Sequence, residues 1–98
     1  MIVRIVKMHF REDCVHSFLD LFEQNKLKIA RFKGCKKLQL LRIENEGNIF
    51  FTYSHWESDR SLNEYRDSDL FKEIWSQTKV LFKEKAEAWT SHVNFESE

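Results

Sequence analysis

The sequence contains no proline and only two glycines, so few residues interrupt regular backbone structure. Gly34 and Gly47 are therefore informative, because glycine accepts turn and left-handed conformations that other residues resist. We expect Gly34 to end a first helix, and Gly47, within Asn-Glu-Gly-Asn, to lie in a hairpin between two strands.

Several kinds of binding site are disfavoured by what the sequence lacks. It has no GxGxxG or Walker-type loop for a nucleotide, and no HxH, HxxxH or HExxH spacing for a metal ion. The charges of its 16 basic and 16 acidic residues sum to zero, so no overall electrostatic field directs the chain to nucleic acid or to a membrane. We therefore expect no metal, no nucleic acid and no membrane partner.

Cysteine is also scarce. Cys14 and Cys35 form no CxxC pair, and the sequence alone leaves open whether they form a disulfide. The apolar stretch at residues 1–10 carries Arg4 and Lys7 and is too short to cross a bilayer. With no recognisable secretion or lipidation signal, we expect a reduced, cytoplasmic protein.

The first half of the chain predicts a strand, a helix and a second strand. With 98 residues, 42% of them hydrophobic, we expect one globular domain over 1–98, with 95–98 as a frayed tail. β-branched residues predict a strand at 2–10. Glu12 and Asp13 suit a helix start, and apolar residues at helical spacing extend that helix to about residue 31. A strand at 35–44 follows.

The second half predicts a strand at 48–56, two helices and a last strand at 87–96. Ser58 or Asp59 caps a short helix, and Ser68 or Asp69 caps a longer one whose apolar pattern runs to Phe82. The order β-α-β-β-α-β, with its second helical unit split, predicts an α+β ferredoxin-like fold with an antiparallel sheet. We expect strands 2–10 and 48–56 at its centre and all helices on one face.

Both faces of the predicted sheet are apolar. Alternation along residues 48–56 places Phe50, Thr52, Ser54 and Trp56 on one face, and Ile49, Phe51, Tyr53 and His55 on the other. Helices can cover only one of these faces. We therefore expect a second copy to cover the other, in a two-fold homodimer through the helix-free face.

The stretch WESDRSLNEYRDSDLFK at residues 56–72, followed by an aromatic helix and a terminal strand, resembles the antibiotic biosynthesis monooxygenase family. That family belongs to the dimeric α/β-barrel superfamily. The resemblance covers nearly the whole chain, including the first strand and the Gly34–Cys35 turn. It implies ferredoxin-like domains whose sheets pair face to face in a dimeric α/β barrel.

The resemblance implies two kinds of activity. Some members oxidise quinols or anthrone-like polyketides with O₂, without flavin or metal, and others bind and cleave haem. Haem-degrading members carry a proximal histidine on the helix after the strand-end tryptophan. Counted from Trp56 without a gap, that position is occupied here by Trp75. The indole of a tryptophan cannot ligate iron as an imidazole does. Their strand-one asparagine falls at or near Lys7. We therefore rank haem cleavage lowest and expect no cofactor.

Cofactor-independent oxidation requires a base, oxyanion donors and a dry aromatic slot. By the family register, Lys7 and His9 face the cleft together with Trp56, which makes His9 the candidate base. We predict His9 and Trp56 as catalytic residues. The predicted substrate-binding residues are Lys7, Phe50, Thr52, Ser54, Tyr65, Phe71 and Trp75.

Each of these residues also has a structural interpretation. Trp56 and the aromatic residues of the last helix suit a core, and His9 suits a polar strand end. Two functions therefore stay open: a cofactor-independent monooxygenase acting on a small quinol- or anthrone-like aromatic, and a non-catalytic small-molecule-binding or stress-related dimer. A reachable polar group beside Trp56 favours the first, and a cleft filled by Trp75 and Phe82 favours the second. The substrate itself cannot be read from the sequence.

Overall fold

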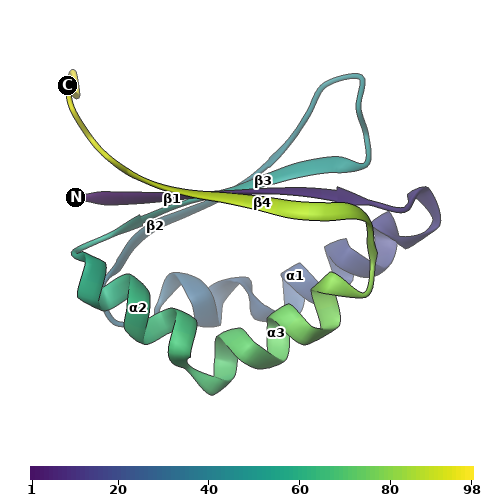
Figure 1. The fold of residues 1–98 in the computed structure, drawn as a ribbon, viewed down its shortest axis with the longest axis horizontal. Helices are drawn as coiled ribbons and strands as arrows, with labels where there is room; N and C mark the ends of the chain where they lie inside the picture. Colours follow the sequence, from purple (N-terminus) through teal and green to yellow (C-terminus); the bar gives the residue numbers. More distant parts are fainter.

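A computed structural model describes residues 1–98 as one four-stranded antiparallel sheet with three α-helices on a single face (Figure 1). The strand order is β2-β3-β1-β4, which confirms the predicted ferredoxin-like fold and its two central strands. The elements are β1 (Ile2–Phe10), a 3₁₀ turn (Glu12–Cys14), α1 (Val15–Ala30), β2 (Cys35–Arg42), β3 (Ile49–Trp56), α2 (Asp59–Asp67), α3 (Asp69–Lys79) and β4 (Phe82–His92).

The pairing of the two central strands determines which side chains meet the helices. β1 and β3 run antiparallel with Ile2 opposite Trp56, and directly opposed residues in such a pair share a face of the sheet. The even-numbered residues of both strands therefore point to the helices. Their pairs are Ile2–Trp56, Arg4–Ser54, Val6–Thr52 and Met8–Phe50.

Two serines begin the two parts of the second helical unit, and each is one of the two cap candidates predicted there. The Ser58 hydroxyl accepts a hydrogen bond from the Ser61 amide at 3.1 Å and begins α2. The Ser68 hydroxyl accepts from the Phe71 amide at 3.1 Å and begins α3, while it donates to the Tyr65 carbonyl at 2.6 Å. Ser68 has an extended backbone (φ −73°, ψ 154°), so one residue ends α2 and turns the chain into α3.

The last strand differs from the prediction at both ends. β4 begins at Phe82 instead of residue 87, and it ends at His92. The apolar spacing of α3 continues in the sequence to Phe82, but Phe82 pairs with Phe10 in the sheet, and the centroids of the two rings lie 5.3 Å apart. Tertiary packing against β1 therefore overrides the helical periodicity. The first helix also differs, because no side chain caps it.

The core between sheet and helices forms two clusters. One contains Met8, Phe10, Phe18 and Phe50, and in it the fully buried Phe10 stacks on Phe18 with ring centroids 4.2 Å apart. The other contains Ile2, Trp56 and Leu62. Aromatic pairs of this kind add roughly 0.5–1.5 kcal/mol beyond the area they bury, so the two clusters hold the helices against the sheet.

The opposite face of the sheet has no helix (Figure 1). Its apolar side chains, placed there by strand register, are Val3, Ile5, Leu41, Ile49, Phe51, Tyr53 and Trp89. Trp89 is 46% exposed and Leu41 is 42% exposed. This agrees with the expectation that both faces are substantially apolar.

Both cysteines are free thiols, so no disulfide joins Cys14 to Cys35. None of the three α-helices combines the length and the apolar character that a membrane-crossing helix requires.

Gly34 should be essential to the fold, whereas Gly47 should not. Gly34 has φ +88°, and a Cβ there would collide with the side chain of Ser61, next to the α2 cap. We expect Gly34→Ala to lower the free energy of unfolding by about 1–3 kcal/mol, measured by urea denaturation. Gly47→Ala is the matched control, because a Cβ at Gly47 would approach only Arg42, at 3.5 Å, and should cost less than about 1 kcal/mol. Equal losses in the two variants would contradict this account of the turn.

Candidate functional site

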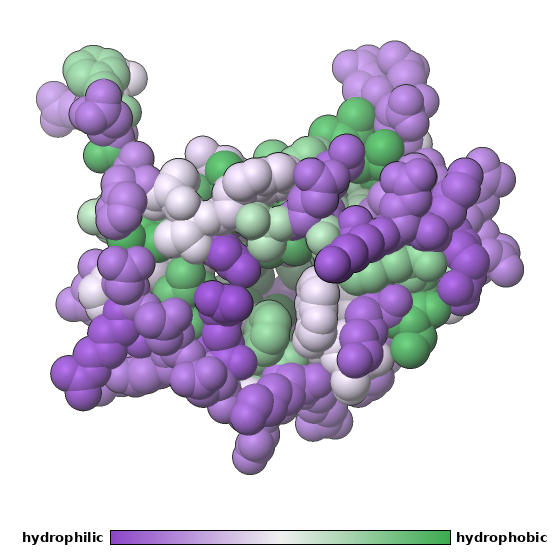
Figure 2. Space-filling view, in the orientation of Figure 1, coloured by the Kyte–Doolittle hydropathy of each residue, from purple (hydrophilic) through white to green (hydrophobic).

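A cavity of about 300 Å³ lies between the sheet and the helices. Figure 2 shows the molecule hollowed there, with hydrophobic side chains inside and strongly hydrophilic ones along part of the rim. Thirteen of the eighteen lining residues are hydrophobic, so the cavity suits a ligand with a mainly apolar body. All four strands and all three α-helices contribute to the lining, which is Arg4, Val6, Met8, Phe18, Phe22, Ile29, Leu38, Thr52, Ser54, Leu62, Tyr65, Arg66, Phe71, Ile74, Trp75, Thr78, Ala86 and Ala88.

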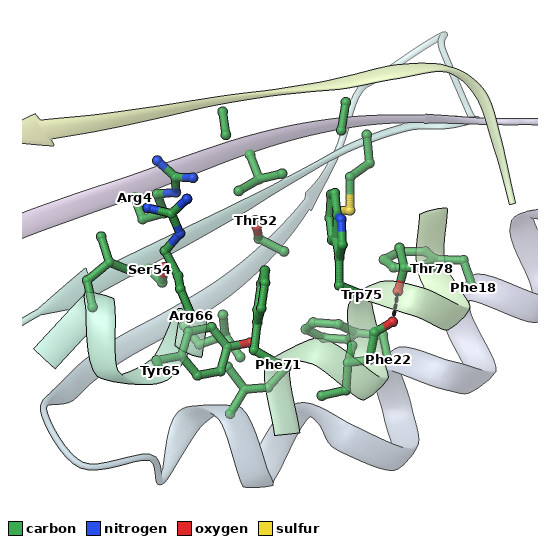
Figure 3. A pocket seen from close by; sticks show the side chains of 18 residues that line it. Arg4, Phe18, Phe22, Thr52, Ser54, Tyr65, Arg66, Phe71, Trp75 and Thr78 are labelled. Atoms are coloured by element: carbon green, nitrogen blue, oxygen red, sulfur yellow. Dashed lines mark hydrogen bonds between the residues drawn. The ribbon is translucent and has the colours of Figure 1, made fainter. Parts of the chain in front are cut away.

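Five of the predicted site residues meet in this cavity (Figure 3). Thr52 and Ser54 come from β3, Tyr65 from α2, and Phe71 and Trp75 from α3. The Phe71 and Trp75 rings are nearly parallel, at 10°, with centroids 5.9 Å apart. These two rings form an aromatic wall, and Thr52 adds a hydroxyl to the lining.

Phe50 and Trp56 do not line the cavity. Each is 1% exposed and belongs to the core clusters. The Trp56 indole N–H donates to the Ser54 hydroxyl at 2.9 Å, and its ring stacks on Tyr65 with centroids 4.9 Å apart. Trp56 thus lies behind the cavity wall and positions two residues that do line it.

Lys7 and His9 lie on the opposite face of the sheet, so the expectation that they face the cleft with Trp56 is wrong. Lys7 pairs with Phe51 and His9 pairs with Ile49, both on the helix-free face. The His9 Nδ1 atom lies 3.2 Å from a carboxylate oxygen of Glu84 on β4. The family register failed by one residue, and in a strand a one-residue shift moves every side chain to the other face.

Two arginines that sequence reasoning missed line the cavity instead. Arg4 comes from β1 and Arg66 from the last turn of α2, and Figure 3 shows both side chains at the same end of the cavity. Arg4 Nη1 donates to the Thr90 hydroxyl at 2.8 Å. Burial, and secondarily the charge of Arg66, lowers the pKa of the Arg4 guanidinium.

A signal for both arginines was present in the sequence. Arg4 lies between Ile2 and Val6 on the even-numbered face of the first strand, and Arg66 follows Leu62 by four residues on one face of its helix. In each case a permanent cation occupies a position where the pattern predicts an apolar side chain. Such a departure from the pattern is typical of a functional position.

The phenol of Tyr65 and the nearby thiol of Cys35 are both neutral at ordinary pH. Burial, with a smaller effect from Cys35, raises the pKa of the Tyr65 phenol well above its usual range. Burial also raises the pKa of the Cys35 thiol. Tyr65 can therefore donate a hydrogen bond to a ligand, but it cannot act as a base near neutral pH.

The donor set of the cavity does not fit haem. No histidine or cysteine belongs to the lining, and its only sulfur atom is that of Met8, which is buried in an aromatic cluster. No three His, Cys, Asp or Glu side chains anywhere in the chain gather in an arrangement that could hold a metal ion. The groups available to a ligand are hydroxyls, guanidiniums and aromatic faces, which suit an organic molecule with one polar end.

The fold and the cavity define a ferredoxin-like α+β protein with a ligand-sized pocket beneath its helices. Residues 1–76 match the family described as antibiotic biosynthesis monooxygenase, and the chain belongs to this family. A curated relative, the heme-degrading monooxygenase of Listeria monocytogenes, is 26% identical over 85 residues. The match covers 87% of this chain but only 48% of that protein, so the chain spans about half the length of this relative.

Solved structures support the fold. A Nitrosomonas europaea protein named for antibiotic biosynthesis monooxygenases has a TM-score of 0.90 at 14% identity, covering 97% of this chain and 100% of its own. Rv0793 from Mycobacterium tuberculosis has a TM-score of 0.90 at 16% identity, and the match covers 99% of this chain and 98% of Rv0793. A conserved protein from Methanosarcina mazei has a TM-score of 0.87 at 21% identity, and the match covers 93% of this chain and 91% of that protein. At these identities the likeness shows the fold alone.

The neutral phenol of Tyr65 should make the protein sensitive to alkali. Because its pKa is raised in the folded state, the unfolded chain loses this proton first, and stability falls as the pH rises above about 10. We expect the difference in unfolding free energy between wild type and Tyr65→Phe to stay constant from pH 7 to 9. Above pH 10 it should shift in favour of the variant by about 1.4 kcal/mol per pH unit, measured by urea denaturation. A difference that stays constant up to pH 11.5 would show that Tyr65 ionises normally.

Proposed function

We propose that this chain is a cofactor-independent monooxygenase that oxidises a small aromatic, quinol- or anthrone-like substrate with O₂ inside the cavity. The observation that carries this proposal is the cavity itself, with the aromatic wall of Phe71 and Trp75 and with its charged groups gathered at one end. Membership of the monooxygenase family supports the reaction type. The two free thiols support a reducing, cytoplasmic location.

The chemistry requires the substrate to become an anion. A phenol or enol loses its proton, and the electron-rich anion passes an electron to O₂. At an anthrone-type methylene, one oxygen atom then becomes the carbonyl oxygen and the other leaves as water. Arg4 and Arg66 would stabilise the substrate anion, and the apolar walls would strengthen that interaction by excluding water. The Tyr65 phenol and the Thr52 hydroxyl would orient the substrate oxygen.

A specific observation favours the alternative of a non-catalytic small-molecule-binding protein. No imidazole and no carboxylate lines the cavity, so the chain offers no general base there. Catalysis would then depend on a substrate that releases its proton to solvent. The two guanidiniums would favour this release by lowering the pKa of the bound substrate. Oxygen consumption separates the two functions directly.

Oxygen uptake with a panel of quinols and anthrones tests the proposed function. We expect wild type to consume O₂ with at least one compound, and Ala88→Phe, which places a ring at the exposed edge of the cavity, to lower the rate at least tenfold. His16→Ala is the control, because His16 is exposed on α1 and its rate should match wild type. Uptake absent across the panel would leave only a binding function. Loss of uptake in His9→Ala would place the chemistry on the helix-free face instead.

The haem alternative has its own test, because the Listeria relative is named for haem degradation. The lining supplies no imidazole or thiolate for iron. We therefore propose that adding haemin to the protein leaves the Soret band unshifted from that of free haemin. A stoichiometric Soret shift would restore haem as the ligand.

We also propose that the chain forms a two-fold homodimer through its helix-free sheet face. The apolar side chains on that face, including the half-exposed Trp89, support this proposal. An isologous pairing of two such faces would bury the whole patch at once. In that arrangement His9 and Lys7 would lie near the interface, not near the substrate.

Phe51, near the middle of β3 on the helix-free face, should be decisive for dimerisation. We expect wild type to have the mass of a dimer by size-exclusion chromatography with light scattering. Phe51→Glu should be a folded monomer, because two carboxylates would be buried in the interface without partners. Gln24→Glu adds the same charge on the exposed surface of α1 and should remain a dimer. A monomeric wild type, or a dimeric Phe51→Glu, would contradict the proposed interface.

A further inference from the structure

The two arginines of the cavity lack a counter-ion. No carboxylate lies within 4.0 Å of either guanidinium group, and the only side-chain hydrogen bond of the pair joins Arg4 to the neutral Thr90 hydroxyl. On the same helix, the exposed Arg60 is paired with Glu64 at 3.1 Å. Arg60 is the only one of the six arginines in an ion pair, and what sets Arg4 and Arg66 apart is that both line one cavity.

This arrangement leaves the charge of the partly buried Arg4 without an opposite charge, while Arg66 reaches the solvent-exposed side of the cavity. Arg4 is partly withdrawn from water, and it lies close enough to Arg66 for the two positive charges to oppose each other. Like charges near a low-dielectric wall repel more strongly than charges in open water. A bound anion between the two groups would remove the repulsion and supply the missing partner.

The rest of the lining indicates what kind of anion would fit. The guanidinium group is a planar fork that matches the two oxygens of a carboxylate. Thirteen of the eighteen lining residues are hydrophobic, so the remainder of the ligand should be apolar. The Phe71 and Trp75 rings are nearly parallel, so each can stack on a planar aromatic ligand that enters the cavity in the same orientation. At about 300 Å³ the cavity has roughly twice the volume of an engineered protein cavity that binds benzene, which suits two fused rings.

A carboxylate fits better than a phosphate. Phosphate sites in proteins gather several backbone amides at a glycine-rich loop or a helix N-terminus. Here Arg66 lies in the last turn of α2, Arg4 lies inside a strand, and neither glycine of the chain lines the cavity. The two guanidiniums match one carboxylate group, and the apolar cavity matches the aromatic rings that carry it.

We propose that Arg4 and Arg66 form an anion subsite, and that this subsite makes the ligand of the cavity a small planar aromatic carboxylate. The inference rests on the proposed function in one respect only, the use of this cavity as the ligand site. It goes beyond that function because it assigns the ligand a permanent negative charge, which a neutral quinol or anthrone lacks.

Binding of a matched pair of probes tests the subsite. The probes are 2-naphthoate and the neutral 2-naphthalenemethanol, with affinities measured by calorimetry at fixed ionic strength. We expect wild type to bind 2-naphthoate at least tenfold more tightly than the alcohol. Arg66→Gln and Arg4→Gln should each weaken 2-naphthoate about tenfold to a hundredfold, as expected for a lost charge-assisted hydrogen bond, and change the alcohol less than about twofold.

Two controls separate recognition from folding. Arg60→Gln removes an arginine from the same helix but outside the cavity, and it should leave both affinities within about twofold of wild type. Without ligand, Arg66→Gln should melt at the same temperature as wild type or higher, because it removes a repulsion. A purely structural role for Arg66 would lower the melting temperature and weaken both probes together.

The outcomes distinguish this inference from the proposed function. Equal binding of the two probes, or equal losses for both in the arginine variants, would overturn the subsite even if quinols or anthrones are oxidised. Selective binding of 2-naphthoate without oxygen uptake would support the subsite and contradict the monooxygenase activity. Binding of neither probe would overturn the subsite, because the cavity would not then hold an aromatic anion.

Discussion

The antiparallel pairing of β1 with β3 is the constraint on which the rest of the structure depends. Because Ile2 lies opposite Trp56, the even-numbered residues of both strands face the helices and the odd-numbered ones face away. That register buries Met8 and Phe10 beneath α1 and directs Arg4 into the cavity. Shifted by one residue, the same sequence would expose its core and move its charges to the helix side.

The cavity follows from this register together with the break between α2 and α3. Ser68 ends one helix and begins the next, so the two helices cross the sheet in different directions, as Figure 1 shows. Two aromatic clusters hold the structure at either end, and the space between them is not filled. Trp56 stacks on Tyr65 from behind the cavity wall, and the raised pKa of Tyr65 keeps its phenol neutral.

Much of the fold was predictable because its signals are local. Ser58 and Ser68 were each one of two predicted cap candidates, and Gly34 was predicted to end the first helix. The alternation of β3 placed Thr52 and Ser54 on one face together with Trp56, and the structure shows that this face meets the helices. The end of α3 was misjudged because Phe82 fits the apolar spacing of a helix as well as that of a strand. Only its pairing with Phe10 of β1 decides that it belongs to the strand.

The site was less predictable because it depends on register between distant strands. His9 was assigned to the cleft by family register, and the structure places it on the other face. Arg4 and Arg66 lie 62 positions apart in the sequence, and only the packed fold brings them to one end of a cavity. The most direct test of the account is the pattern of nuclear Overhauser effects between bound 2-naphthoate and the protein methyl groups. The account predicts contacts to Val6, Met8 and Ala86; contacts to Val3, Ile5 and Ile49 instead would contradict it.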